Sequence, residues 1–252
     1  MPRQFEIAMD VEADAEPQDV WEAIATGPGM DSWFMGRNEV EPGEGGKVEF
    51  TVGDFTQTAR VVTWEPPTHF VSRSDPGPDG AYHQFEYRVD ASGGGRSAIR
   101  FEHRGMLGED WEAEYEAMQQ GDAMYLDKLV QYLNHFRGRF AIPVEAFGPI
   151  VPDRDDAMAG FRTALGLDKD VAVGDRVRFA PEGMPAADGV VDYVSPNFLG
   201  VRTPDGLYRF IYAFTGNVII GHHLFAPGSD QRTAERDWAA WLDRVFAQPA
   251  DG

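Results

Sequence analysis

Residues 108–136, GEDWEAEYEAMQQGDAMYLDKLVQYLNHF, form the longest helical pattern in this chain. Aromatic and aliphatic residues recur there at steps of three and four, which places them on one face of a helix. They are Trp111, Tyr115, Met118, Tyr125, Leu129, Tyr132 and Phe136. About 27 residues rising 1.5 Å each make roughly 40 Å of helix, enough to cross a small sheet. Asp110 can accept hydrogen bonds from the first free N–H groups, so the pattern predicts a capped amphipathic helix over a sheet.

One acidic residue, Asp122, interrupts the apolar face of this helix. It lies four residues after Met118 and three before Tyr125. A carboxylate in such a place requires a partner, a raised pKa or a wet cavity. We interpret Asp122 as a candidate cavity carboxylate that binds a polar ligand group or acts as an acid or base. The alternative is a solvated aspartate, or one held by an arginine or tyrosine.

The chain before this helix predicts the sheet that the helix covers. Apolar and polar residues alternate over 5–11, and residues 17–24 carry a short apolar helical stripe that begins at a proline. A second short helix is expected near Trp33. The strand patterns fall at 5–11, 47–52, 56–64, 69–73, 82–90 and 96–104. The last two strands are joined by SGGG and predict a hairpin.

Two histidines lie on the hairpin strands. Alternation places His83, Phe85, Tyr87 and Val89 on one side, and Ile99, Phe101 and His103 on another. We expect the face of His103 to meet the long helix, where the imidazole can hydrogen-bond a ligand or pair with Asp122. His83 is a weaker candidate of the same kind. The alternative for both is a core histidine with satisfied hydrogen bonds.

A curved antiparallel sheet around a long C-terminal helix leaves a space between them, and such spaces bind small molecules. The aromatic residues of this half either line that space or form the core. A binding protein predicts a pocket above roughly 300 Å³ there, and a space filled by side chains would contradict that hypothesis. The predicted ligand-binding residues are Asp122, His103, His83, Trp33, Phe85, Tyr87, Met118 and Tyr125. No nucleophile accompanies Asp122 and His103, so we assign no catalytic residue and favour a binding protein over an enzyme.

Four segments carry a resemblance to a known family. They are AEPQDVWEAIATGPGMDSWF, WEPPTHFVSR, FEHRGML and GDAMYLDKLVQYLNHF, and they fall within about residues 4–140. In this order and spacing they resemble the SRPBCC (START-like, helix-grip) superfamily, in the branch related to the activator of heat-shock protein 90 ATPase. That branch often has Gly-Trp where this chain has Gly121-Asp122, which argues against a purely apolar pocket.

The resemblance implies an α+β helix-grip fold and a capacity for ligand binding. The superfamily includes lipid carriers, hormone receptors, polyketide cyclases and chaperone-binding proteins, and fold alone does not fix function. Our first hypothesis is a protein that binds an amphipathic or apolar ligand. The second is a cyclase- or dehydratase-type enzyme that uses Asp122 and His103. The third is a chaperone-ATPase modulator with a role in the stress response, ranked last because the family activator has a separate N-terminal chaperone-binding domain.

The second half predicts a smaller α+β domain that looks like a reduced copy of the first. We place domains at 1–139 and 140–252, because residues 140–152 carry three prolines and few charges. A helix is expected from Asp153 to Gly166, and a closing helix carries Trp238 and Trp241. Short strands are expected at 174–180, 189–195, 198–203, 207–214 and 217–225. Residues 142–147 can supply the missing edge strand; an unrelated small β domain is the alternative.

Composition excludes several kinds of partner and site. The chain has 252 residues and a formal net charge of −20, so we predict no nucleic-acid partner. The acidity suits solubility or salt adaptation; a cationic partner is the alternative. Without cysteine there is no disulfide, and the adjacent His222 and His223 point to opposite strand faces, so we predict no metal site, one histidine facing inward and the other exposed. With no apolar run of 18 residues or signal peptide, we predict a cytoplasmic protein without membrane insertion or cofactor; homodimerisation stays open.

Overall fold

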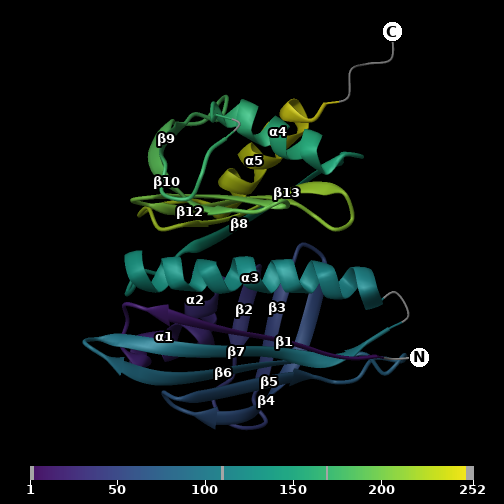
Figure 1. Ribbon diagram of the computed structural model, residues 1–252, viewed down its shortest axis with the longest axis vertical. Helices are drawn as coiled ribbons and strands as arrows, with labels where there is room; N and C mark the ends of the chain where they lie inside the picture. The colour runs from purple at the N-terminus through teal and green to yellow at the C-terminus, as the bar shows by residue number, and fades with distance from the viewer. Residues whose placement is uncertain (1–2, 109–110, 169, 248–252) are drawn as a thin grey trace. The chain divides into compact units, whose positions relative to one another are not determined.

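The computed structural model describes residues 3–108, 111–168 and 170–247 (Figure 1). The chain divides into two compact units, Met1–Phe140 and Ala141–Gly252. Each unit contains one antiparallel sheet and helices, so the predicted α+β class is confirmed. None of the helices in the described ranges is long and apolar enough to cross a membrane.

The N-terminal unit is built on a seven-stranded sheet with the order β1-β7-β6-β5-β4-β3-β2. Every neighbouring pair is antiparallel. The strands are β1 Arg3–Ala13, β2 Arg37–Val40, β3 Lys47–Val52, β4 Phe55–Glu65, β5 His69–Ser74, β6 Tyr82–Gly93 and β7 Arg96–Leu107. Strand β2 was not predicted, since four residues are too few to show a period. The helices α1 Pro17–Ala25 and α2 Gly27–Met30 connect β1 to β2.

The predicted long helix is α3, Trp111–His135, and it lies across one face of this sheet (Figure 1). Its apolar face is buried at Leu129 and Tyr132, while Met118 packs against a cluster of Phe5, Ile7 and Leu107. The sheet therefore grips the helix, as the resemblance implied. Asp110, expected to cap the helix, lies outside the described residues.

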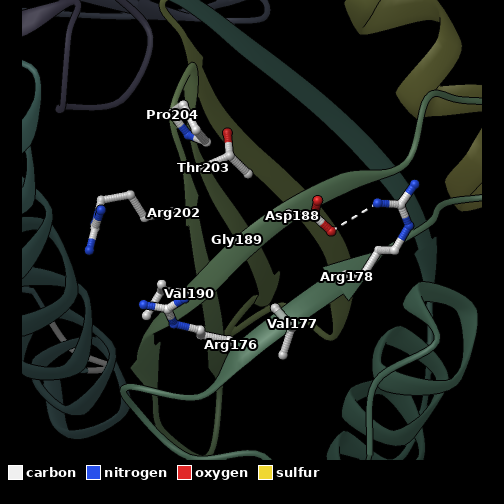
Figure 2. A pocket seen from close by; sticks show the side chains of 9 residues that line it. All are labelled: Arg176, Val177, Arg178, Asp188, Gly189, Val190, Arg202, Thr203 and Pro204. Carbon is white, nitrogen blue, oxygen red and sulfur yellow. Dashed lines mark hydrogen bonds and ion pairs between the residues drawn. The ribbon is translucent and has the colours of Figure 1, made fainter.

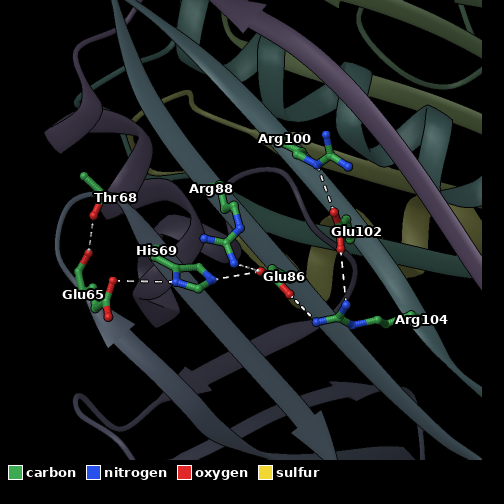
Figure 3. A network of polar contacts seen from close by, with 8 residues as sticks. All are labelled: Glu65, Thr68, His69, Glu86, Arg88, Arg100, Glu102 and Arg104. Atoms are coloured by element: carbon green, nitrogen blue, oxygen red, sulfur yellow. Dashed lines mark hydrogen bonds and ion pairs between the residues drawn. The ribbon is translucent and has the colours of Figure 1, made fainter.

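The other face of the sheet carries a polar network centred on Glu86 (Figure 3). Its carboxylate accepts hydrogen bonds from His69 Nε2 at 2.9 Å and Arg104 Nη2 at 2.6 Å, and pairs with Arg88 Nη2 at 2.7 Å. Burial opposes ionisation of Glu86, but the hydrogen bond from His69 and the two arginine charges lower its pKa overall. These contacts satisfy the buried charge of Glu86 and link β5, β6 and β7. We therefore interpret the network as stabilising the sheet rather than as a functional site.

The C-terminal unit repeats the arrangement with one strand fewer. Its sheet has the order β8-β13-β12-β11-β10-β9, which matches the first sheet without β2. The strands are β8 Ile142–Ile150, β9 Arg176–Phe179, β10 Ala187–Val194, β11 Phe198–Thr203, β12 Gly206–Tyr212 and β13 Asn217–Leu224. As predicted, residues 142–147 form part of an edge strand, which pairs with β13 on one side only. An edge strand tolerates Pro143, since no further strand pairs with its outer side.

Two helices complete the C-terminal unit. Helix α4, Arg154–Leu165, is capped by Asp153 and ends at Gly166, whose φ of 70° suits glycine. Helix α5, Gln231–Val245, buries Trp238 and Trp241 in the core. This unit is the predicted reduced copy, with a closing helix of 15 residues against 25 in the first unit.

The paired histidines of β13 correct one expectation. His222 is fully buried on the face that meets α5, and its ring centre lies 4.4 Å from that of Trp238. His223 is also buried, at 2%, so the expectation that one of the two histidines is exposed is wrong. Alternation separates the two side chains as predicted, but it does not predict how deeply each one is buried.

Candidate functional site

Three side chains of the N-terminal unit form a hydrogen-bonded chain from α3 into the sheet. Asp122 Oδ2 lies 2.7 Å from His103 Nδ1, and His103 Nε2 lies 3.0 Å from His83 Nδ1. The side chains of His103 and Asp122 are 4% and 14% exposed, so water competes little for these bonds. The hydrogen bond between Asp122 and His103 satisfies the need for a partner that the helical pattern had indicated.

The chemistry of the end group fixes the tautomers along this chain. An ionised carboxylate only accepts hydrogen bonds, so His103 donates through Nδ1–H to Asp122. In neutral His103 the other nitrogen, Nε2, is then an acceptor, and His83 must donate to it through Nδ1–H. Neutral His83 is left with an accepting Nε2, for which the described residues provide no hydrogen-bond partner. The chain therefore presents one imidazole lone pair of known orientation.

Burial keeps this end of the chain neutral. Burial first, and then the neighbouring His103, lower the pKa of His83 to about 4. The ring of Phe85 stacks on His103 at 4.1 Å between centres, and the ring of Phe5 meets it edge-on at 5.0 Å. Apolar rings thus surround the polar chain, which strengthens its hydrogen bonds and excludes solvent.

Strand register brings the two histidines together. His83 lies opposite Gly105, and Phe85 lies opposite His103, so all four positions share one face of the sheet, and the expectation that His83 and His103 lie on different sides is wrong. Gly105 stands between Phe5 and His83 in the row across β1, β7 and β6. A Cβ atom at Gly105 would lie 1.9 Å from the carbonyl oxygen of Tyr82 and 3.1 Å from the Phe5 ring, so only glycine fits. His83 therefore approaches His103 diagonally over the space that glycine leaves.

His83 lines a small cavity on this face of the sheet. The cavity has a volume of about 40 Å³, which is close to the space of one water molecule. Its wall consists of Met30, Phe34, Val48, Phe50, Gln57, Ala59, Phe70, Ser72, Ser74, His83, Phe85 and Tyr87. This volume is well below the roughly 300 Å³ that we predicted as the minimum for a ligand pocket, so that prediction is wrong for this structure. The difference arises because aromatic side chains occupy the space under the sheet's curvature.

Five of the eight predicted ligand-binding residues meet at or beside this cavity. His83, Phe85 and Tyr87 belong to its wall, and His103 and Asp122 continue from His83. Tyr87 is buried, and burial together with the charge of Asp122 raises its pKa. The phenol therefore stays protonated at neutral pH.

The other three predicted residues lie elsewhere. Trp33 does not line the cavity, because its Nε1–H donates to the Ala23 carbonyl at 2.9 Å and its indole packs in the core. Met118 packs against the Phe5 cluster instead. Tyr125 lies outside the wall, with its ring 5.2 Å from that of Phe34.

Several wall residues were not among the eight predicted ligand-binding residues. Phe34 and Phe50 contact each other at 5.7 Å between ring centres. Ser72 and Ser74 follow Phe70 at a period of two, which was the available signal for their shared face. Gln57 gave no signal of its own, because glutamine occurs on exposed strand faces as often as in cavity walls.

The fold and its cavity define the class of protein. A curved antiparallel sheet that grips a long C-terminal helix is the helix-grip fold of the SRPBCC superfamily. Residues 14–134 match the family described as Activator of Hsp90 ATPase homolog 1-like protein. The N-terminal unit of this chain belongs to that family.

The chain is also similar to several solved structures. The Aha1 dimer from Colwellia psychrerythraea is 17% identical, with 52% of this chain and 96% of that chain covered and a TM-score of 0.43. Protein MLL2253 from Mesorhizobium loti is 17% identical, with 51% and 96% covered and a TM-score of 0.45. The di-domain ARO/CYC BexL from the BE-7585A biosynthetic pathway is 13% identical, with 97% and 100% covered and a TM-score of 0.47. No curated protein matches the sequence.

Proposed function

We propose that the N-terminal unit binds a small, largely apolar molecule that carries a hydroxyl group. The observation that supports this proposal is the Asp122–His103–His83 chain, which ends at an accepting Nε2. An acceptor held in an apolar wall favours a ligand with one O–H donor, such as a phenol or an alcohol. The hydroxyl donates to His83, while the aromatic wall contacts the rest of the molecule.

The cavity must widen to admit such a ligand. Its present 40 Å³ holds about one water, whereas small-molecule sites usually span roughly 300–1,000 Å³. Phe34 and Phe50 close one side of the cavity, and Tyr125 of α3 packs on Phe34. Rotation of these rings about their side-chain bonds enlarges the space without breaking the sheet, since none of the three rings takes part in a strand ladder.

Acid–base catalysis of the cyclase or dehydratase type is the second candidate. In that reaction the ligand proton passes to His83 Nε2, the Nδ1 proton of His83 passes to His103 Nε2, and Asp122 stabilises the imidazolium that forms. The hydrogen bond between Asp122 and His103 supports this candidate, since the hypothesis uses these two side chains as acid–base groups. Ligand binding stands first because the pKa of His83, about 4, makes it a weak base at neutral pH.

Binding of 1-naphthol, compared with its methyl ether, tests the proposal. The two probes share an aromatic body, but only 1-naphthol has a donor for His83. We expect the wild-type protein to bind 1-naphthol about tenfold more tightly in a fluorescence titration, which corresponds to one buried hydrogen bond. Failure to bind either probe, or equal affinity for both, contradicts the proposal.

Two variants locate that preference. His83→Phe keeps the ring volume but removes the acceptor, so we expect the preference for 1-naphthol to disappear. Gln57→Leu removes a different polar group from the same wall and serves as the matched control. If Gln57→Leu abolishes the preference and His83→Phe keeps it, the hydroxyl site lies elsewhere.

A further inference from the structure

A second cavity lies in the C-terminal unit, on the strands β9, β10 and β11 (Figure 2). Its volume is about 630 Å³, far larger than the cavity beside His83. The wall consists of Arg176, Val177, Arg178, Asp188, Gly189, Val190, Arg202, Thr203 and Pro204. Three arginines face one carboxylate there, although the whole chain has a net charge of −20.

Sheet register places two of these arginines in one row. Val190 of β10 pairs with Arg176 of β9 on one side and with Arg202 of β11 on the other. Directly paired residues of antiparallel strands project to the same face, so both guanidinium groups flank Val190. Figure 2 shows the two side chains on one side of the cavity and the Arg178–Asp188 pair on the other.

The charges of Arg176 and Arg202 are not compensated within the unit as described. Arg178 Nη1 pairs with Asp188 Oδ1 at 2.9 Å, which uses the carboxylate of the wall. Among the described residues, neither Arg176 nor Arg202 forms an ion pair, and Arg202 Nε is buried without a hydrogen-bond partner. An unpaired buried donor costs free energy, which a bound acceptor recovers.

We propose that this cavity binds a small molecule that carries a phosphate or pyrophosphate group. Guanidinium groups present forked N–H donors that match phosphate oxygens, and two of them in one row can hold one multivalent anion. The volume of 630 Å³ leaves room for an organic portion beside the phosphate. Val190 and Pro204 provide apolar contacts for that portion.

A large polyanion suits this site less well than a small one. A nucleic acid or an anionic membrane extends over the acidic surface around the cavity and is repelled by the net charge of −20. A small phosphate compound lies within the local field of Arg176 and Arg202. The ligand class is therefore a soluble phosphate ester or diphosphate.

Calorimetric titration of the full-length protein with inorganic pyrophosphate tests this site. At low ionic strength we expect saturable binding, which weakens at least about tenfold in Arg176→Gln/Arg202→Gln. The control variant Arg154→Gln/Arg236→Gln also removes two positive charges from this unit, but from exposed arginines that pair with Asp155 and Asp237. It should bind pyrophosphate like the wild type. Equal weakening in both double variants indicates diffuse electrostatics and overturns the proposal.

Two further measurements keep the test independent of variant folding. In the wild-type protein, the Arg202 Nε–H resonance should shift on addition of pyrophosphate, since this donor lies at the cavity. A short DNA duplex at the same phosphate concentration should leave it unchanged. No shift with pyrophosphate at saturating concentration, or a larger shift with DNA, overturns the proposed ligand class.

Discussion

The two units place a histidine on the corresponding strand and surround it differently. β7 and β13 each lie second in their sheets, beside the first strand of the unit. On β7, His103 meets Asp122 of α3 at 2.7 Å. On β13, His222 meets the indole of Trp238 of α5, and its Nδ1 accepts the backbone N–H of Arg209 at 3.1 Å.

The difference shows that the closing helix decides what such a histidine does. In the N-terminal unit the helix supplies a carboxylate, and the polar chain continues to His83 and the cavity wall. In the C-terminal unit the helix supplies aromatic volume, and His222 becomes part of a core with Tyr208 and Phe210. One scaffold therefore supports a polar chain in one copy and a packed core in the other.

The largest effect is expected from Trp238→Ala in the C-terminal unit. The indole is 5% exposed and packs on His222, Phe210 and Trp241, so its removal should cost about 3–5 kcal/mol of unfolding free energy. Hydrogen exchange of the β12 and β13 amides measures this loss. A loss of unfolding free energy below about 1 kcal/mol would show that the packing of α5 on His222 contributes little to the core.

A smaller loss is expected from Asp122→Ala in the N-terminal unit. His103 would remain buried without its acceptor, at a cost of about 2 kcal/mol in urea unfolding. Nitrogen NMR of the imidazoles should show His103 and His83 protonated at Nδ1 in the wild type and mixed tautomers in the variant. Glu112→Ala, at an exposed position of the same helix, is the control and should change neither the unfolding free energy nor the tautomers of the two histidines.

The pH dependence of the N-terminal unit should report His83. Its folded-state pKa of about 4 lies below the ordinary value of 6.5, so the unfolded chain binds the proton more readily. The stability that neutral His83 contributes to the folded state is fully present above pH 6.5 and is lost as the pH falls toward 4. We expect about 1–2 kcal/mol for this partly exposed ring, and a flatter profile for His83→Phe between those limits. An unchanged slope in the variant would assign the loss to other groups.

The smallest effect is expected from Arg178→Gln, which breaks an exposed ion pair. The side chains of Arg178 and Asp188 are 65% and 78% exposed, so the loss should stay below about 0.5 kcal/mol. Thermal unfolding at low and moderate salt measures it. A loss as large as that of Asp122→Ala would remove the distinction between a buried polar chain and a surface pair.

The sequence was sufficient for the order of elements in both units. Alternation located nearly every strand, and the apolar period located α3, α4 and α5. The same pattern placed Asp122 on the covered face of its helix and His103 on the face that meets it. The cavity volume was not predictable, because it depends on how Phe34, Phe50 and Tyr125 pack, and packing is decided by side-chain shape rather than by periodicity.

By itself, then, the sequence predicted a sheet that grips a helix and a smaller copy of that arrangement, and it offered a contact between Asp122 and His103 as one of two alternatives. Only the tertiary structure decided that His83 joins them. Gly93 pairs with Arg96, whereas Ala91 pairs with Ser97, so a bulge shifts the hairpin register by one residue. Without that shift His83 would lie opposite an even-numbered residue and on the other face from His103, because a one-residue slip reverses every side chain of a strand.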